Sequence, residues 1–110
     1  MQTGDDDSGP VLVTGAARRI GRAIARRFAA AGRPVVMHGH PRSARDVEAA
    51  VAGIEAAGGR AAAAFADLAD AESTGGLIAQ AARAFGAPTL LVNNARQYLG
   101  LWMLIFLRQR

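Results

Sequence analysis

The sequence of 110 residues lacks cysteine and lysine and contains few aromatic residues. The absence of cysteine excludes disulfides, thiolate metal sites and thiol catalysis. The absence of lysine excludes Schiff-base chemistry and any mechanism that needs an ammonium group in the active site. Aromatic residues make up 5% and apolar residues 51% of the chain, so a core must consist mainly of Ala, Val, Ile and Leu. This composition predicts one compact domain with an aliphatic core and no metal site.

The two ends of the chain lack the patterns of a secretion signal and of a membrane span. Residues 1–9 are acidic and contain no apolar stretch, so we expect a disordered leader rather than a signal peptide. The longest apolar run, residues 99–107, would span about 15 Å as a helix, half of a bilayer core of roughly 30 Å. We therefore expect a cytoplasmic protein with no membrane partner.

Apolar runs alternate with amphipathic segments along residues 10–95. Such alternation is typical of right-handed βαβ units that build a parallel sheet. The sequence therefore predicts one Rossmann-like α/β domain, with four parallel strands in the order 3-2-1-4 and helices on both faces. The expected strands are 10–14, 34–37, 61–66 and 89–93; the expected helices are 19–31, 44–57 and 71–84, with a polar turn over 38–43.

Residues 14–21 form a glycine-containing loop between the first strand and the first helix. Gly15 would let the chain turn sharply out of the strand. Gly21 would let the helix pack closely on the sheet and leave its N–H groups free for a phosphate. Two glycines with five residues between them also occur in ordinary strand-to-helix turns. The position within a βαβ unit favours a dinucleotide site.

Three motifs, taken in order, resemble the short-chain dehydrogenase/reductase family. They are the loop at 14–21, Ala-Asp-Leu at 66–68 after the third strand, and Leu-Val-Asn-Asn-Ala at 91–95 after the fourth. The family usually has glycine where this chain has Arg19. The pair Arg18 and Arg19 resembles the pteridine reductase branch specifically. The resemblance implies hydride transfer from NADPH to a C=N or C=O bond of a small-molecule substrate.

The end of the second strand indicates NADP rather than NAD. An acidic residue at this place normally holds the free ribose 2′-hydroxyl of NAD. The stretch 38–43 contains no carboxylate, and the first one after it is Asp46. Arg42 could pair with a 2′-phosphate, with the Ser43 hydroxyl and Arg18 beside it.

Several of the implied cofactor contacts have a plainer alternative. In pteridine reductases a His-x-His-Arg-Ser stretch binds the 2′-phosphate, and here Pro41 is inserted before the arginine. His38 and His40 could instead be loop histidines that face water, and Asp67 could simply end its strand. The cofactor-binding residues that the resemblance implies are Gly15, Arg18, Arg19, Ile20, Gly21, His38, His40, Arg42, Ser43, Asp67, Leu68, Asn93, Asn94 and Ala95.

A basic stripe on the first helix raises the question of nucleic acid. Arg19, Arg22 and Arg26 share one helical face, and the chain carries a formal charge of +4. Such a stripe could contact a phosphate backbone. No aromatic platform accompanies it, so we favour a solvated amphipathic face and expect no nucleic-acid partner.

The family's catalytic pair is missing from this sequence. Reduction in the family uses Tyr-x-x-x-Lys, whose tyrosine donates the proton. The chain has one tyrosine, Tyr98, and no lysine, so we predict no catalytic residue. Residues 96–110 form an apolar tail that matches nothing expected of the family, through a change of reading frame or through divergence.

We therefore predict the NADP-binding half of a short-chain reductase, truncated after the fourth strand. By itself it should be inactive in turnover, with weak or no affinity for NADPH. The alternatives are a non-catalytic interaction module and a truncated gene product. In both, the apolar tail would cause homo-oligomers or aggregates.

Overall fold

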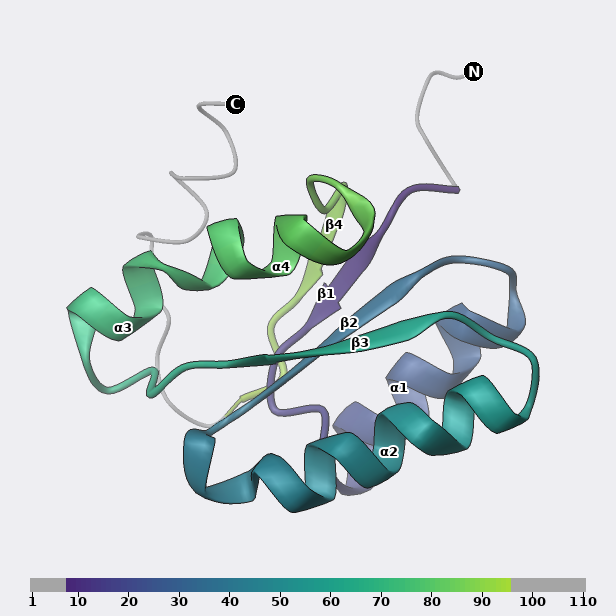
Figure 1. Cartoon of the computed structure of the whole chain (residues 1–110), viewed down its shortest axis with the longest axis horizontal. Helices are drawn as coiled ribbons and strands as arrows, with labels where there is room; N and C mark the ends of the chain where they lie inside the picture. The colour runs from purple at the N-terminus through teal and green to yellow at the C-terminus, as the bar shows by residue number, and fades with distance from the viewer. Residues whose placement is uncertain (1–7, 96–110) are drawn as a thin grey trace.

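The computed structural model describes residues 8–95, which form one parallel sheet of four strands (Figure 1). The strand order is β3-β2-β1-β4, and each neighbouring pair is parallel. The predicted Rossmann-like fold and its strand order are therefore confirmed. The strands are β1 (Val11–Val13), β2 (Val35–Gly39), β3 (Ala61–Phe65) and β4 (Leu90–Val92).

Helices cover both faces of this sheet, as the alternating pattern predicts. α1 and α2 lie on one face, and α3 and α4 lie on the other (Figure 1). A short 3-10 helix, η1, connects β2 to α2. The bounds are α1 (Arg19–Ala30), η1 (Pro41–Ser43), α2 (Ala44–Ala56), α3 (Ala71–Gly75) and α4 (Leu77–Phe85).

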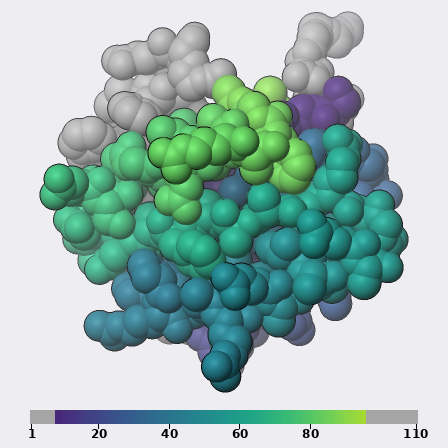
Figure 2. All heavy atoms as spheres, viewed as in Figure 1, coloured from purple at the N-terminus to yellow at the C-terminus, as the bar shows by residue number. Residues whose placement is uncertain are grey.

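The side chains of β1 alternate between two aliphatic clusters, one under each layer of helices. Val11 and Val13 pack with Ala25 of α1, whereas Leu12 packs with Leu77 of α4. All three strand residues are fully buried. Burial on both faces explains why β1 is a continuous apolar run rather than an alternating one. Figure 2 shows α4 above the α2–β3 region on this face of the molecule.

Two elements differ from the predicted ones. The expected helix over 71–84 is divided into α3 and α4 at Gly75 and Gly76, where the Gly76 N–H donates to Ser73 O in a tighter turn. Glycine destabilises a helix interior by about 1 kcal/mol relative to alanine, and two in succession favour a break. The polar turn begins after β2 rather than at His38, because His38 and Gly39 still pair with β3.

Some expectations fall on residues outside the described range. The acidic leader is mostly within residues 1–7, and the apolar tail is residues 96–110. Within residues 8–95, no helix is both long and apolar enough to cross a membrane.

Candidate functional site

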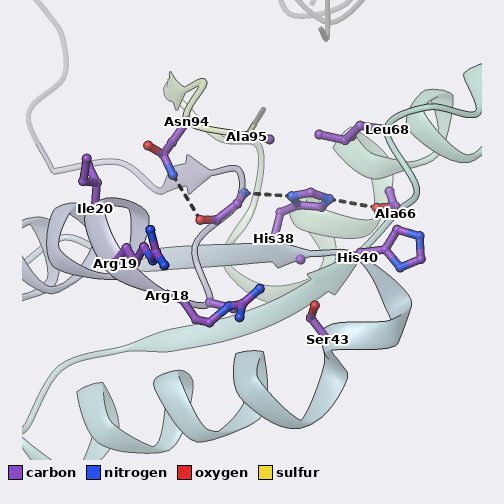
Figure 3. A pocket seen from close by; sticks show the side chains of 13 residues that line it. Arg18, Arg19, Ile20, His38, His40, Ser43, Ala66, Leu68, Asn94 and Ala95 are labelled. Atoms are coloured by element: carbon purple, nitrogen blue, oxygen red, sulfur yellow. Dashed lines mark hydrogen bonds between the residues drawn. The ribbon is translucent and has the colours of Figure 1, made fainter. Parts of the chain in front are cut away.

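A cavity of about 650 Å³ opens where the carboxyl ends of the strands meet (Figure 3). Its wall combines the loop after β1, the end of β2 and the segments that follow β3 and β4. Open parallel sheets bind ligands at this edge. The lining residues are Gly15, Ala17, Arg18, Arg19, Ile20, His38, Gly39, His40, Ser43, Ala66, Leu68, Asn94 and Ala95.

The cavity brings together most of the residues singled out in the sequence. Ten of the fourteen implied cofactor-binding residues line it, and the other four, Gly21, Arg42, Asp67 and Asn93, do not. Three lining residues, Ala17, Gly39 and Ala66, are not among the fourteen that the resemblance implies. Ala17 lies within the loop at 14–21, Ala66 begins the Ala-Asp-Leu motif, and Gly39 lies between His38 and His40, so each could have been found from its position in or beside these motifs.

Gly15 turns the chain out of β1 and into the cavity wall. Its φ of +61° lies in the left-handed region that favours glycine. The Gly15 N–H donates to His38 Nδ1 at 3.1 Å, and the Gly15 carbonyl accepts from Asn94 Nδ2 at 3.1 Å. The adjoining Ala16 N–H donates to His38 O at 2.9 Å. The loop is therefore held from β2 and from the segment after β4.

Gly21 lies beneath this loop in the first turn of α1 and is buried. A Cβ atom placed on Gly21 would collide with Gly15 O and Asn94 Nδ2. The helix therefore approaches the loop as closely as the glycine spacing predicts. This contact brings the N-terminus of α1 to the cavity, because Arg18, Arg19 and Ile20 all line it.

Thr14 fixes the end of β4 against the end of β1. Its hydroxyl oxygen accepts from the Asn94 N–H at 2.9 Å and from the Ala95 N–H at 3.1 Å. The side chain is fully buried. Thr14 thus aligns two cavity residues without lining the cavity itself. In the sequence, Thr14 could have been found from its position directly before Gly15.

His38 lies at the end of β2 and joins two parts of the cavity wall. Its side chain lines the cavity but is only 3% exposed, which corrects the alternative of a loop histidine facing water. Nδ1 accepts from the Gly15 N–H, and Nε2 lies 2.9 Å from Ala66 O. Burial lowers the pKa of His38; the bond to Ala66 raises it, and the charge of His40 lowers it. His38 is therefore neutral at pH 7.

His40 and Ser43 extend the wall beyond β2. His40 caps η1, because its Nδ1 accepts from the Arg42 N–H at 3.0 Å. Ser43 lines the cavity, whereas Arg42 is exposed and does not. The cap and Pro41 orient η1 so that the serine, and not the arginine, belongs to the wall.

Asp67 and Leu68 follow β3 and have different surroundings. The Asp67 carboxylate accepts from the Ala69 N–H at 3.0 Å, and Oδ2 lies 3.7 Å from His40 Nε2. Asp67 therefore shapes the turn after β3 and stands outside the lining. Leu68 is buried and lines the cavity. Within residues 8–95, no group of three acidic or histidine side chains could hold a metal ion.

The cavity is positively charged on the side of the β1–α1 loop. Arg18 and Arg19 are exposed, line the cavity and stand at the N-terminus of α1, whose first turn contains no acidic residue. The helix dipole adds positive potential at this end. Figure 3 shows Arg18 and Ser43 on the same side of the cavity. Free helix N–H groups with two guanidinium groups are suited to a phosphorylated ligand.

Arg19 has a φ of +55° and is the one residue other than glycine with positive φ among residues 8–95. The left-handed conformation costs roughly 1–2 kcal/mol for a residue with a Cβ atom. The loop therefore holds this arginine in a conformation that suits the glycine usual in the resembling family.

Comparison with curated proteins identifies relatives over the same part of the chain. L-rhamnose 1-dehydrogenase (NAD(P)(+)) of Azotobacter vinelandii is 48% identical over 88 residues, covering 77% of this chain and 34% of the relative. Hydroxysteroid dehydrogenase-like protein 2 of Danio rerio is 39% identical over 90 residues, covering 77% of this chain and 22% of the relative. The chain thus spans about a third of the first protein and less than a quarter of the second.

Solved structures of a reductase and a short chain dehydrogenase also match most of this chain. FolM alternative dihydrofolate reductase 1 from Brucella canis, complexed with NADP, is 43% identical with a TM-score of 0.75. The match covers 84% of this chain and 36% of that one. A short chain dehydrogenase from Burkholderia cenocepacia, in complex with NADP, is 48% identical with a TM-score of 0.70, covering 77% and 34%.

The family model described as short chain dehydrogenase matches residues 10–100, which is most of the sequence. This range includes all four strands, the loop after β1 and the segment after β4. The sequence match and the fold agree, and the cavity lies at the carboxyl edge of the sheet. The chain therefore belongs to the short-chain dehydrogenase family.

Proposed function

We propose that the cavity binds the adenosine half of NADP(H), and that the chain is the cofactor-binding part of a pteridine reductase-like oxidoreductase. The observation that carries this proposal is the composition of the wall: Arg18, His40 and Ser43 line it, and among residues 8–95 no carboxylate does. A carboxylate would bind the 2′-hydroxyl of NAD. Arginine and hydroxyl donors favour a 2′-phosphate instead.

Two of the solved relatives support NADP over NAD. The FolM reductase and the Burkholderia cenocepacia dehydrogenase are both described as NADP complexes, at 43% and 48% identity. The FolM relative also favours a pteridine reductase-like parent, because dihydrofolate contains a pterin ring. A small pterin-like molecule with a reducible C=N bond is therefore the substrate class that we propose for the longer enzyme.

Each part of the wall has a role in this proposal. The backbone N–H groups at the start of α1 would bind the pyrophosphate, with the guanidinium group of Arg19 beside it, whereas Arg18 would approach the 2′-phosphate. Leu68 would pack on the adenine, and Ile20, which is 68% exposed, would offer an apolar contact. Asn94 would border the ribose. Arg42 could approach the 2′-phosphate only from outside the cavity.

We further propose that these 110 residues bind the cofactor without reducing a substrate. The sequence contains no Tyr-x-x-x-Lys pair, and a missing positioned acid typically lowers the rate by about 10²–10⁴. Binding should be weak, with a Kd near 1 mM or about 4 kcal/mol, because the chain supplies only one part of the cofactor site.

The proposal is tested by titrating the chain with NADP⁺ and following backbone amide signals by NMR, a method suited to weak binding. Arg18→Met should raise the Kd about tenfold, equivalent to ~1.4 kcal/mol. The matched control is Arg83→Met, which removes the same charge from an exposed position on α4, and it should leave the Kd within twofold.

Equal effects of Arg18→Met and Arg83→Met would show that binding depends on net charge and not on the cavity. Signals that move only in residues remote from Gly15 and Leu68 would place the ligand elsewhere. Either outcome would contradict the proposed site.

A further inference from the structure

His38 is a buried side chain of β2 whose two ring nitrogens both contact backbone groups of the cavity wall. Nδ1 lies 3.1 Å from the Gly15 nitrogen, and Nε2 lies 2.9 Å from the Ala66 oxygen. Gly15 begins the loop after β1, and Ala66 directly follows β3. One imidazole therefore spans from β1 across β2 to β3 at the edge where the cavity opens (Figure 3).

The chemistry of the two partners fixes the form of the ring. A backbone N–H can only donate, so Nδ1 must be an unprotonated acceptor. A carbonyl oxygen can only accept, so Nε2 must carry the hydrogen. The neutral Nε2–H tautomer alone satisfies both contacts. This arrangement leaves neither nitrogen available to a phosphate, unlike the direct contact that the family resemblance implies for His38.

We propose that His38 is a positioning residue for the cofactor site: its neutral ring holds the Gly15 loop and the Ala66 strand end at the spacing that the dinucleotide requires. This inference rests on the proposed function, because it concerns the site for the same ligand. Protonation of Nδ1 would place an N–H against the N–H of Gly15. The loop would then lose its side-chain anchor, and ligand affinity would fall.

Burial and nearby charges together set the pH at which His38 gains this proton. His40, which is next but one along the chain, lowers the pKa of His38 in addition to the larger effect of burial. Arg18 and Arg19 line the same cavity from the loop, and Asp67 faces His40 from the segment after β3. A lowered pKa places protonation below the ordinary value of 6.5, so the neutral ring prevails at pH 7 and is lost in acid.

Two substitutions in the full chain separate the two ring contacts. Asparagine puts an amide oxygen near the place of Nδ1, so His38→Asn should keep an acceptor for Gly15. Glutamine puts an amide nitrogen near the place of Nε2, so His38→Gln should keep the Ala66 contact and lose the Gly15 contact. Neither side chain titrates between pH 5 and 8.

The first readout needs no ligand. Long-range ¹H–¹⁵N spectra should show the Nε2–H tautomer of His38 at pH 7. The Gly15 amide signal should shift with the same midpoint as the His38 ring on acidification, while the Ala25 amide in α1 serves as a reference. At pH 7 the Gly15 amide should exchange with solvent about tenfold faster in His38→Gln than in His38→Asn. If His38→Gln does not fold, the wild-type titration still decides.

The second readout is the affinity for 2′,5′-ADP at pH 5 to 8, measured by NMR titration. His38→Gln should bind about tenfold more weakly than wild type at pH 7, and His38→Asn within threefold. The ligand phosphates also titrate in this range, so wild type and His38→Asn, which share every other side chain, are compared at each pH. Their ratio should move by about tenfold in favour of His38→Asn as the pH falls.

The Nδ1–H tautomer, or a Gly15 signal that ignores the titration of His38, would overturn the inference. Wild-type affinity in His38→Gln would overturn it as well. If no variant and no wild-type sample binds 2′,5′-ADP, the proposed function fails, while the Gly15 and tautomer data still decide the positioning role.

Discussion

Gly21 and Arg19 lie two residues apart in the first turn of α1, and a different constraint acts on each of them. Gly21 has no space for a Cβ atom, because Gly15 O and Asn94 Nδ2 fill that space. Arg19 has space for its side chain but holds a left-handed backbone that favours glycine. The first position is fixed by packing, and the second retains a side chain at a cost in backbone strain.

Gly21→Ala should destabilise the chain by about 1–3 kcal/mol, because the new methyl group must displace backbone and the Asn94 amide. The control is Gly75→Ala at the end of α3, where nothing lies within 4 Å of the new Cβ atom. That variant should be neutral or more stable by up to about 1 kcal/mol. Urea unfolding measures both, and equal stabilities would contradict the close packing of α1 on the loop.

Arg19→Gly should raise the stability of the chain and lower its affinity for NADP⁺. Relief of the positive φ should raise the free energy of unfolding by up to about 1 kcal/mol, offset in part by the greater entropy of glycine when unfolded. Loss of the guanidinium group should raise the Kd for NADP⁺ several-fold. Urea unfolding and an NMR titration of the same sample test this. If the variant binds NADP⁺ as tightly as wild type, Arg19 does not contribute to cofactor binding.

At the scale of elements, α4 protects the outer strand β3. The Gln80 side chain accepts from the Phe65 N–H at 2.8 Å and donates to the Phe65 carbonyl at 3.0 Å. These two bonds occupy the backbone groups that a further strand would use. They also hold the end of β3, from which Ala66 and Leu68 enter the cavity wall.

Gln80→Ala should therefore destabilise the chain by about 1–3 kcal/mol, since both Phe65 groups lose their partner. Gln80→Glu keeps the acceptor and loses the donor, so its stability should fall between the two. Thermal or urea unfolding gives the order wild type, Gln80→Glu, Gln80→Ala. An alanine variant as stable as wild type would show that water replaces the side chain without loss.

For the molecule as a whole, the strand order was predictable because each of the first three apolar runs ends at a polar residue and is followed by a helical pattern, and a fourth apolar run comes after the last helix. The loop after β1 was predictable for the same reason, since Gly15 and Gly21 stand at a strand-to-helix junction. These features depend on neighbours in the sequence. The division of the helix has a local signal too, since Gly75 and Gly76 stand together within the expected helix.

Other features depend on contacts between distant segments and could not be predicted. The burial of His38 follows from the pairing of β2 with β3 and from its bonds to Gly15 and Ala66. The position of Arg42 outside the cavity follows from the His40 cap of η1. No local pattern distinguishes a buried histidine at a strand end from one in a loop.

We expect the cavity to prefer an adenosine that carries a 2′-phosphate. The most direct test compares 2′,5′-ADP with 5′-AMP as ligands of the wild-type chain by NMR titration at pH 7. We expect at least tenfold tighter binding of 2′,5′-ADP, or ~1.4 kcal/mol, with the largest signal changes in the β1–α1 loop and after β2. Equal affinity for the two nucleotides, or tighter binding of 5′-AMP, would contradict it.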